Sequence, residues 1–143
     1  MPVDNGNEPV EPSEIVYRRV GNGFYAPTRP EPLSPKAFRP LPGDVDGISL
    51  TRARYGSSPQ NVGEDGFVGR EYYVIEISAG DIESIGLTLR PDPLPDNSGH
   101  AVIPKLNYAS VTVPEVLGLM NAMRQLPYKA HGPFVGKKPK NPA

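Results

Sequence analysis

Proline is the residue type that most restricts how this chain can fold. Nineteen prolines and fifteen glycines make up about a quarter of its 143 residues, and six of the prolines fall within residues 24–44. Proline lacks a backbone N–H donor and disfavours a helical conformation in the residue before it. We therefore expect no long helix and no central strand in residues 24–44. Elsewhere we expect short elements joined by long loops.

Strands are predicted where apolar and polar side chains alternate. The clearest segment is EYYVIEIS, residues 71–78, in which Tyr73, Ile75 and Ile77 share one face. Weaker segments with β-branched or aromatic residues are 14–20, 47–55, 87–91 and 100–106. Pro104 restricts the second half of the last segment to a sheet edge or a bulge.

One longer helix is predicted at residues 112–127. Thr112 and Glu115 have the spacing of a capping box, and Pro127 ends the segment. The apolar stripe of this helix has three- and four-residue spacing and consists of Val116, Leu119, Met120, Met123 and Leu126. A short helical turn is also predicted after Ser34, which makes Phe38 the anchor between the proline-rich loop and the core.

These elements predict an α+β fold. We expect a small, mostly antiparallel or mixed sheet of four to five short strands, one C-terminal helix packed on it, and long proline- and glycine-rich loops. Residues 14–127 form the expected single domain. Residues 1–13 carry acids and no base, residues 128–143 carry four lysines and no acid, and both segments are predicted to be disordered tails.

The composition excludes some classes of site and leaves others without support. Cysteine is absent, which excludes disulfides, thiolate catalysis and cysteine-based metal sites. The net charge of −1 gives no general argument for nucleic acid or an anionic membrane as a partner. We see no apolar segment long enough to cross a bilayer and no secretory signal, so we expect a cytoplasmic protein.

His100 follows the turn-forming run in DPLPDNSGHAVI and begins a predicted strand. Histidine is the usual proton shuttle and metal ligand near neutral pH. A metal site needs further ligands, but His131 is the only other histidine and no metal-ligand spacing occurs, so we expect neither a metal nor a cofactor. Two interpretations stay open. His100 is a catalytic or binding residue beside Asp92, Asp96 and Asn97, or it is the polar first residue of a core strand.

A second set of candidates lies on three predicted strands. Arg18 and Arg19 alternate on the first strand and should point to opposite faces, where one of them could bind a phosphate or carboxylate. Ser49 or Thr51 lies on the next strand, and Glu76 lies on the strand after it. This order resembles that of ADP-ribosyltransferase folds, in which the arginine binds a pyrophosphate and the glutamate stabilises an oxocarbenium-like ribose. Any β protein offers such residues on strands, so solvent-facing side chains are the competing interpretation.

Four segments together resemble a group of small bacterial proteins without an assigned activity. The segments are IVYRRV, LSPKAFRP, DGISLTR and DPLPDNSGHAVI, and they span about residues 15–105. The resemblance implies that the segments around Phe38, the Asp46-Gly47 turn and the turn before His100 meet on one surface. Asn97 and His100 would then form a pocket rim with Arg39 or Arg52.

From these observations we expect a non-enzymatic bacterial domain that binds a protein partner. Its proline-rich loop, residues 24–44, and its two tails would be the contact elements, with an apolar surface around Phe24, Tyr25 or Phe38. Two alternatives stay open. One is a small enzyme or toxin of the ADP-ribosyltransferase type, and the other is a nucleic-acid accessory protein that uses the lysine-rich tail.

Overall fold

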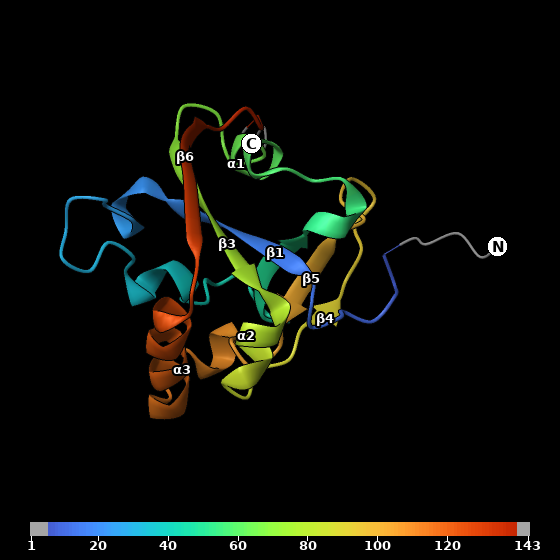
Figure 1. Ribbon diagram of the computed structural model, residues 1–143, viewed down its shortest axis with the longest axis vertical. Helices are drawn as coiled ribbons and strands as arrows, with labels where there is room; N and C mark the ends of the chain where they lie inside the picture. The colour runs from blue at the N-terminus through green and yellow to red at the C-terminus, as the bar shows by residue number, and fades with distance from the viewer. Residues whose placement is uncertain (1–5, 140–143) are drawn as a thin grey trace.

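A single antiparallel sheet runs through the computed structural model, which describes residues 6–139 (Figure 1). Within these residues the sheet has six strands in the order β4-β5-β2-β1-β3-β6. The strands are β1 (Ile15–Gly21), β2 (Ile48–Arg52), β3 (Glu71–Ser78), β4 (Arg90–Pro91), β5 (His100–Ile103) and β6 (Lys129–Val135). The expected α+β class is therefore found, with six strands where four to five were predicted.

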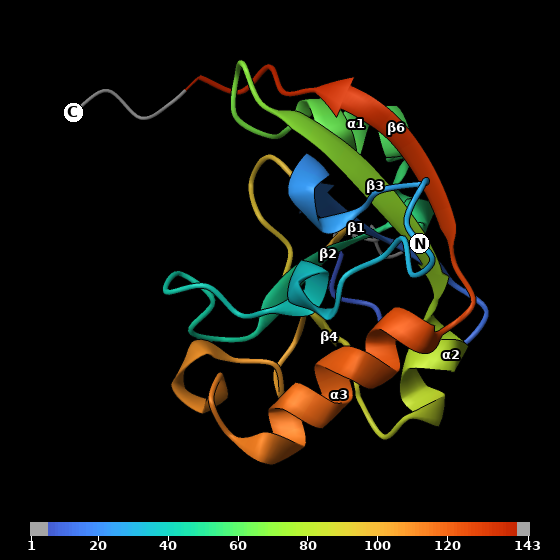
Figure 2. The same cartoon turned by 90° about the vertical axis from the view of Figure 1, so that its left-hand side faces the viewer.

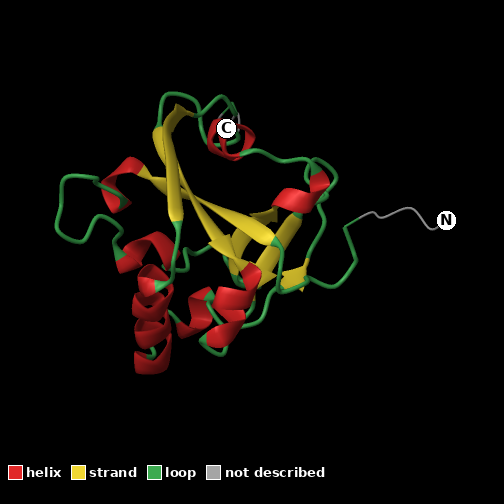
Figure 3. Cartoon of the chain, in the orientation of Figure 1, coloured by secondary structure: helices red, strands yellow, loops and turns green. Residues whose placement is uncertain are grey.

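Helices are short and loops are long, as the proline content predicts (Figure 3). The α-helices are α1 (Pro59–Glu64), α2 (Ala79–Ser84) and α3 (Pro114–Gln125). The 3₁₀ turns are η1 (Asn22–Phe24), η2 (Pro35–Phe38), η3 (Ala53–Tyr55) and η4 (Tyr108–Ser110). Among the described residues, no helix is long and apolar enough to cross a membrane.

The proline-rich loop is anchored as predicted. The Ser34 side chain accepts a hydrogen bond from the Lys36 backbone N–H, and Pro35 occupies the first position of the η2 turn. Phe38 at the end of this turn is fully buried. The loop is therefore fixed to the core although it has no strand or long helix of its own.

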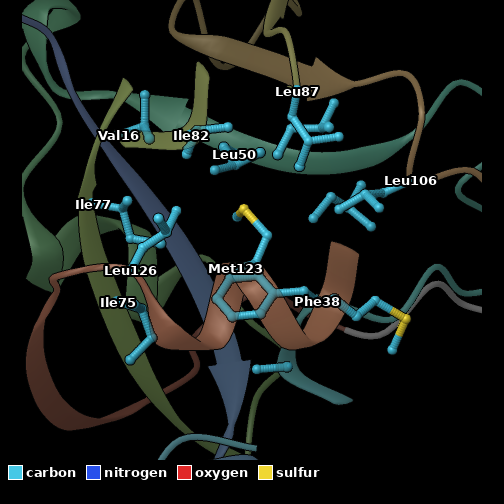
Figure 4. Close-up of a cluster of buried hydrophobic side chains, with 14 of the residues drawn as sticks. Val16, Phe38, Leu50, Ile75, Ile77, Ile82, Leu87, Leu106, Met123 and Leu126 are labelled. Carbon is cyan, nitrogen blue, oxygen red and sulfur yellow. The ribbon is translucent and has the colours of Figure 1, made fainter. Parts of the chain in front are cut away.

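The larger core lies on one face of the sheet. Val16, Leu50 and Ile75 come from three adjacent strands and belong to one cluster with Phe38 and Met123 (Figure 4). Helix α3 contributes Val116 and Met120 to the same cluster. Figure 2 shows α3 and α2 at the end of the molecule opposite α1.

The opposite sheet face carries a smaller cluster. Tyr17 of β1 and Val74 of β3 pack with Val62 of α1, and Phe134 of β6 covers them. β6 pairs antiparallel with β3 from Glu71↔Val135 to Glu76↔Lys129. The segment predicted to be a disordered basic tail therefore contains the last strand. Residues 140–143 of that predicted tail lie outside the described residues.

The N-terminal segment also has defined contacts. The backbone carbonyls of Glu8 and Pro9 accept hydrogen bonds from the guanidinium of Arg52, at 2.7 and 3.1 Å. Residues 6–13 are thus held against the end of β2, in place of the disorder predicted for them. Residues 1–5 of the predicted tail lie outside the described part of the chain.

Helix α3 differs in detail from the predicted helix. It begins at Pro114, its N-cap is Val113, and no side chain caps it. The predicted capping box from Thr112 is therefore not formed. Glu115 instead makes an ion pair with Lys105, with 2.7 Å between Oε1 and Nζ. The helix is followed by β6, so it is not the last element of the chain.

Candidate functional site

A polar pocket of about 250 Å³ lies beside β1 and β2, where these neighbouring strands stop pairing. They pair only at Val16↔Arg52 and Tyr17↔Thr51, whereas β1 pairs with β3 along its whole length. The residues beyond these two pairs are thus free of the β1–β2 ladder and line the pocket. Its polar and charged lining consists of Tyr17, Arg18, Arg19, Ser49, Thr51, Asp65, Asp96, Asn97, His100 and Lys138.

Arg18 occupies the space between the two separated strands. Its Nε donates to the Ala37 carbonyl at 3.1 Å, and its Nη1 donates to the Ser49 carbonyl at 2.9 Å. The Ser49 carbonyl lies on β2 beyond the last residue paired with β1, so the guanidinium replaces a missing ladder partner. Burial lowers the pKa of Arg18 to about 10, while the charge of Asp44 opposes this shift. Arg18 is therefore still a cation at neutral pH.

This cation has no ion pair within the part of the chain that the structure describes. Both hydrogen bonds of the Arg18 side chain go to neutral backbone carbonyls, and they use Nε and Nη1. No acceptor among residues 6–139 takes a hydrogen bond from Nη2, and no described side-chain nitrogen is both sealed from solvent and unpaired. Nη2 therefore keeps contact with solvent, on a side chain that lines the pocket.

His100 connects the pocket wall to Asp92, the residue that follows β4. Its Nδ1 lies 2.8 Å from the backbone carbonyl oxygen of Asp92 and 3.3 Å from the carboxylate Oδ2 of the same residue. Its Nε2 lies 2.9 Å from Oγ of Ser49. Because a carbonyl oxygen can only accept, the neutral imidazole carries its proton on Nδ1. Nε2 is then the acceptor for the Ser49 hydroxyl proton.

The loop before His100 is fixed by Asn97. The Asn97 side chain donates to Oγ1 of Thr51 at 3.2 Å and accepts from the Gly99 N–H at 3.1 Å. The turn predicted at residues 97–100 is thus tied to β2, next to the strand position that faces the pocket. This contact fixes the start of β5, where His100 pairs with Thr51 of β2.

The outer part of the pocket carries charges of both signs. Arg19 donates from Nη1 to the Val62 carbonyl at 3.1 Å and lies 3.9 Å from the Asp65 carboxylate. Its guanidinium also lies over the ring of Tyr72. Lys138 reaches the pocket because its backbone is hydrogen-bonded to Gly66 and Val68.

Several predicted binding residues lie apart from this pocket. Asn97 and His100 line it, together with Arg18 and Ser49. Phe38 is in the core, Arg39 is exposed outside the pocket, and Arg52 is fully buried in a bidentate ion pair with Glu14. The predicted rim of Arg39 or Arg52 around His100 is therefore not formed.

Glu76 is separated from the other catalytic candidates. It lies outside the pocket lining, and its Oε1 accepts from Nε2 of His131 at 2.9 Å. The cross-strand row runs from Thr51 to Tyr17 to Glu76, so the buried Tyr17 stands between the pocket and this carboxylate. The arrangement expected of an ADP-ribosyltransferase site, with arginine, serine and glutamate in one pocket, is not assembled here.

The contact between Ser49 and His100 was not foreseen from the sequence. Both residues were candidates, but they are 51 positions apart and meet only through the pairing of β2 with β5. The single available signal was Asp92 eight residues before His100, with a turn-forming run between them. Within the described residues, no group of three or more acidic or histidine side chains could hold a metal ion.

No protein-family model, no curated protein and no solved structure matches this chain.

Proposed function

We propose that this chain binds a small anionic ligand in the pocket beside β1 and β2. The observation that carries the proposal is Arg18, a half-buried cation held by two neutral carbonyls and without an ion pair among the described residues. Buried charges in proteins are normally paired, because an isolated charge loses its hydration. A carboxylate or phosphate group at Nη2 would supply the missing negative charge.

The rest of the pocket supports the same class of ligand. Arg19 and Lys138 add positive charge, whereas Asp65 and Asp96 add negative charge at other points of the lining. Ser49 and Thr51 offer hydroxyl groups. At about 250 Å³ the pocket is smaller than the roughly 300–1,000 Å³ of sites for drug-sized molecules. These features favour a small organic anion with hydroxyl or amino groups over a polymer.

The proposal is tested by an NMR titration of ¹⁵N-labelled protein with orthophosphate, acetate and citrate at constant ionic strength. We expect saturable shifts of amides in residues 17–19, 49–51 and 97–100. Arg18→Gln should weaken binding about ten- to a hundredfold, which corresponds to the loss of one charged hydrogen bond. The matched control is Arg39→Gln, which removes an exposed arginine outside the pocket.

Loss of the fold is separated from loss of the ligand by a second variant. Arg18→Gln also removes donors to the Ala37 and Ser49 carbonyls, so its amide spectrum must first show a folded protein. Lys138→Gln removes a charge from the edge of the pocket and leaves the core intact. If both variants bind these anions as tightly as Arg39→Gln does, the proposal is wrong.

A protein partner stays a prediction to which no surface is assigned. Phe38, expected to be part of an apolar contact surface, is fully buried. Tyr25 packs edge-on against Tyr73, with 4.8 Å between ring centroids. For the nucleic-acid alternative, Lys137 of the lysine-rich segment is paired with Glu64 at 2.9 Å.

A further inference from the structure

We propose that Ser49 is the nucleophile of an acyl-transfer site, with His100 as its general base and Asp92 as the residue that positions the imidazole. The substrate class is a small ester of a carboxylic acid. This inference rests on the proposed function for one point only, the stabilisation by Arg18 of the negative charge that develops on the substrate's carbonyl oxygen. The chemistry at Ser49 is a separate claim and has its own test.

The hydrogen bonds of His100 have the direction that a general base requires. Nδ1 of His100 donates to Asp92, so Nε2 presents a lone pair to the Ser49 hydroxyl at 2.9 Å. A serine is a weak nucleophile unless an adjacent base removes its proton, and a third group must hold that base in the correct tautomer. Asp92 supplies this third group twice, through its carbonyl oxygen and through its carboxylate at 3.3 Å.

The Ser49 hydroxyl is accessible from the pocket. Ser49 lines the pocket, as do His100 and Arg18, so a bound molecule can reach the serine. Side chains of β2 alternate, and Ile48 and Leu50 on either side of Ser49 are buried in the larger core. The polar hydroxyl is thus directed to the sheet face away from that core, where the imidazole reaches it.

The positive charge of Arg18 lies next to the proposed nucleophile. Nη1 of Arg18 donates a hydrogen bond to the backbone carbonyl of Ser49, so the cation is fixed to the same residue that carries the attacking oxygen. Attack on an ester places negative charge on the carbonyl oxygen of the substrate, and a preorganised cation nearby stabilises that charge. Arg18 is the group of the pocket with this role.

The reaction follows in two balanced steps. Oγ of Ser49 forms a bond to the ester carbon while its proton passes to Nε2 of His100, and the C–O bond to the alcohol breaks as the alcohol takes that proton. Water then attacks the acyl-serine, gives one proton to Nε2, and the bond from carbon to Oγ breaks as Oγ recovers that proton. The net change is the hydrolysis of one ester to an acid and an alcohol.

The test is covalent labelling of the full chain with a fluorophosphonate, read by intact mass and peptide mapping. We expect one adduct, on Ser49, and none in Ser49→Ala. The matched control is Ser57→Ala, since Ser57 is a half-buried serine outside the pocket, and this variant should be labelled like the wild type. Absence of a Ser49 adduct in the folded wild type, or an unchanged adduct in Ser49→Ala, overturns the proposal.

The role of His100 has a readout that a structural role would not change. His100→Ala should slow labelling about a hundredfold or more, the usual effect of a general base. Free imidazole should restore labelling of His100→Ala but not of Ser49→Ala. If labelling of His100→Ala is as fast as that of the wild type, or if imidazole has no effect on a folded His100→Ala, the base is not His100. Anion binding that persists without Ser49 labelling removes the nucleophile and leaves the binding function in place.

Discussion

Arg52 shows how one residue joins two parts of the chain that are distant in sequence. Its Nε and Nη2 each lie 2.8 Å from a carboxylate oxygen of Glu14, and its side chain is fully buried. The carbonyls of Glu8 and Pro9 accept further hydrogen bonds from the same guanidinium. The N-terminal segment therefore satisfies a charge that β2 brings into the interior, which explains why this segment is ordered despite its polar composition.

Glu14→Gln should destabilise the protein and change its pH dependence. Burial alone would raise the pKa of the Glu14 carboxyl, but the hydrogen bonds from Arg52 and from the Glu11 backbone, with the charges of Arg52 and Arg54, lower it below its usual 4.5. The ion pair therefore stabilises the fold above about pH 4.5, and this contribution is lost as pH falls through the lowered pKa. The loss in the variant at pH 7 should be about 3 kcal/mol, the low end for breaking a buried pair, because backbone carbonyls still accept from Arg52.

Urea unfolding at pH 3 to 7 measures this effect. The difference in free energy of unfolding between wild type and Glu14→Gln should be largest near neutral pH and should shrink below pH 4.5. Glu83→Gln, an exposed carboxylate on α2, is the control and should leave the curve unchanged. A difference that does not vary with pH would show that the charge of Glu14 contributes nothing to stability.

The sequence predicts several residues of the candidate site but not the contacts between them. Arg18, Ser49 and His100 are polar residues on predicted strands, Asn97 lies in the predicted turn before His100, and all four line one pocket. Their mutual contacts depend on strand register and on where β1 and β2 separate, and local patterns contain neither. Arg52 looks equivalent to these residues in the sequence, but its partner Glu14 lies 38 positions away, so its burial was not predictable.

Elements follow the sequence closely where a face is buried and poorly where it is not. β3 and α3 carry strong periodicity because one side of each contacts the larger core. β6, with the sequence KAHGPFV, contains glycine and proline and has mostly exposed or half-buried side chains. An edge strand needs only one neighbour and can carry such residues. Its pairing with β3 is set by tertiary contacts, and this explains why its sequence alone predicts a tail.

Gly118→Ala should stabilise the protein. Gly118 is exposed in the middle of α3, and a Cβ added there meets no atom within 4 Å. Alanine in a helix interior is favoured over glycine by about 1 kcal/mol, because it loses less backbone entropy on folding. Thermal unfolding should show a melting temperature several degrees higher, and a lower one would mean that α3 does not need to be helical at this position.

Gly63→Ala should destabilise the protein. Gly63 is buried in α1, and a Cβ added there would lie 2.6 Å from Cδ2 and 2.7 Å from Cβ of Phe134. Relief requires α1 or β6 to move, because the Cβ of Phe134 is fixed to its backbone. Such overpacking costs about 1–3 kcal/mol. Urea unfolding beside Gly118→Ala gives the measurement, and Gly63→Ala combined with Phe134→Gly, which removes the clashing atoms, should recover part of the overpacking loss if the clash is its cause.

At the scale of the whole molecule, one end of the described chain covers a buried side chain of the sheet and the other end adds an edge strand to it. Residues 6–14 cover Arg52, and β6 covers Tyr17 and Val74 through Phe134. The segment after β6 continues this role, since Lys137 pairs with Glu64 and Lys138 reaches the candidate pocket. The termini thus contribute both to stability and to the site, and a boundary drawn from composition alone would remove them.

Shortening the chain at its C-terminus should therefore reduce stability in two unequal steps. A chain ending at residue 135 keeps β6 but loses the Lys137–Glu64 pair, a surface interaction worth about 0–1 kcal/mol. It also loses the backbone hydrogen bonds of residues 136–138, which go to Glu64, Gly66, Val68 and Arg70 and are worth about 0.5–1.5 kcal/mol each. A chain ending at residue 127 also loses the β3–β6 ladder, the His131–Glu76 contact and the packing of Phe134. We expect the second step to cost at least about 3 kcal/mol, the lower end for losing a packed phenylalanine and a large share of the 5–15 kcal/mol typical of a domain. Urea unfolding of the three chains measures both steps, and equal stability of the chains ending at 127 and 135 would mean that β6 is not part of the folded sheet.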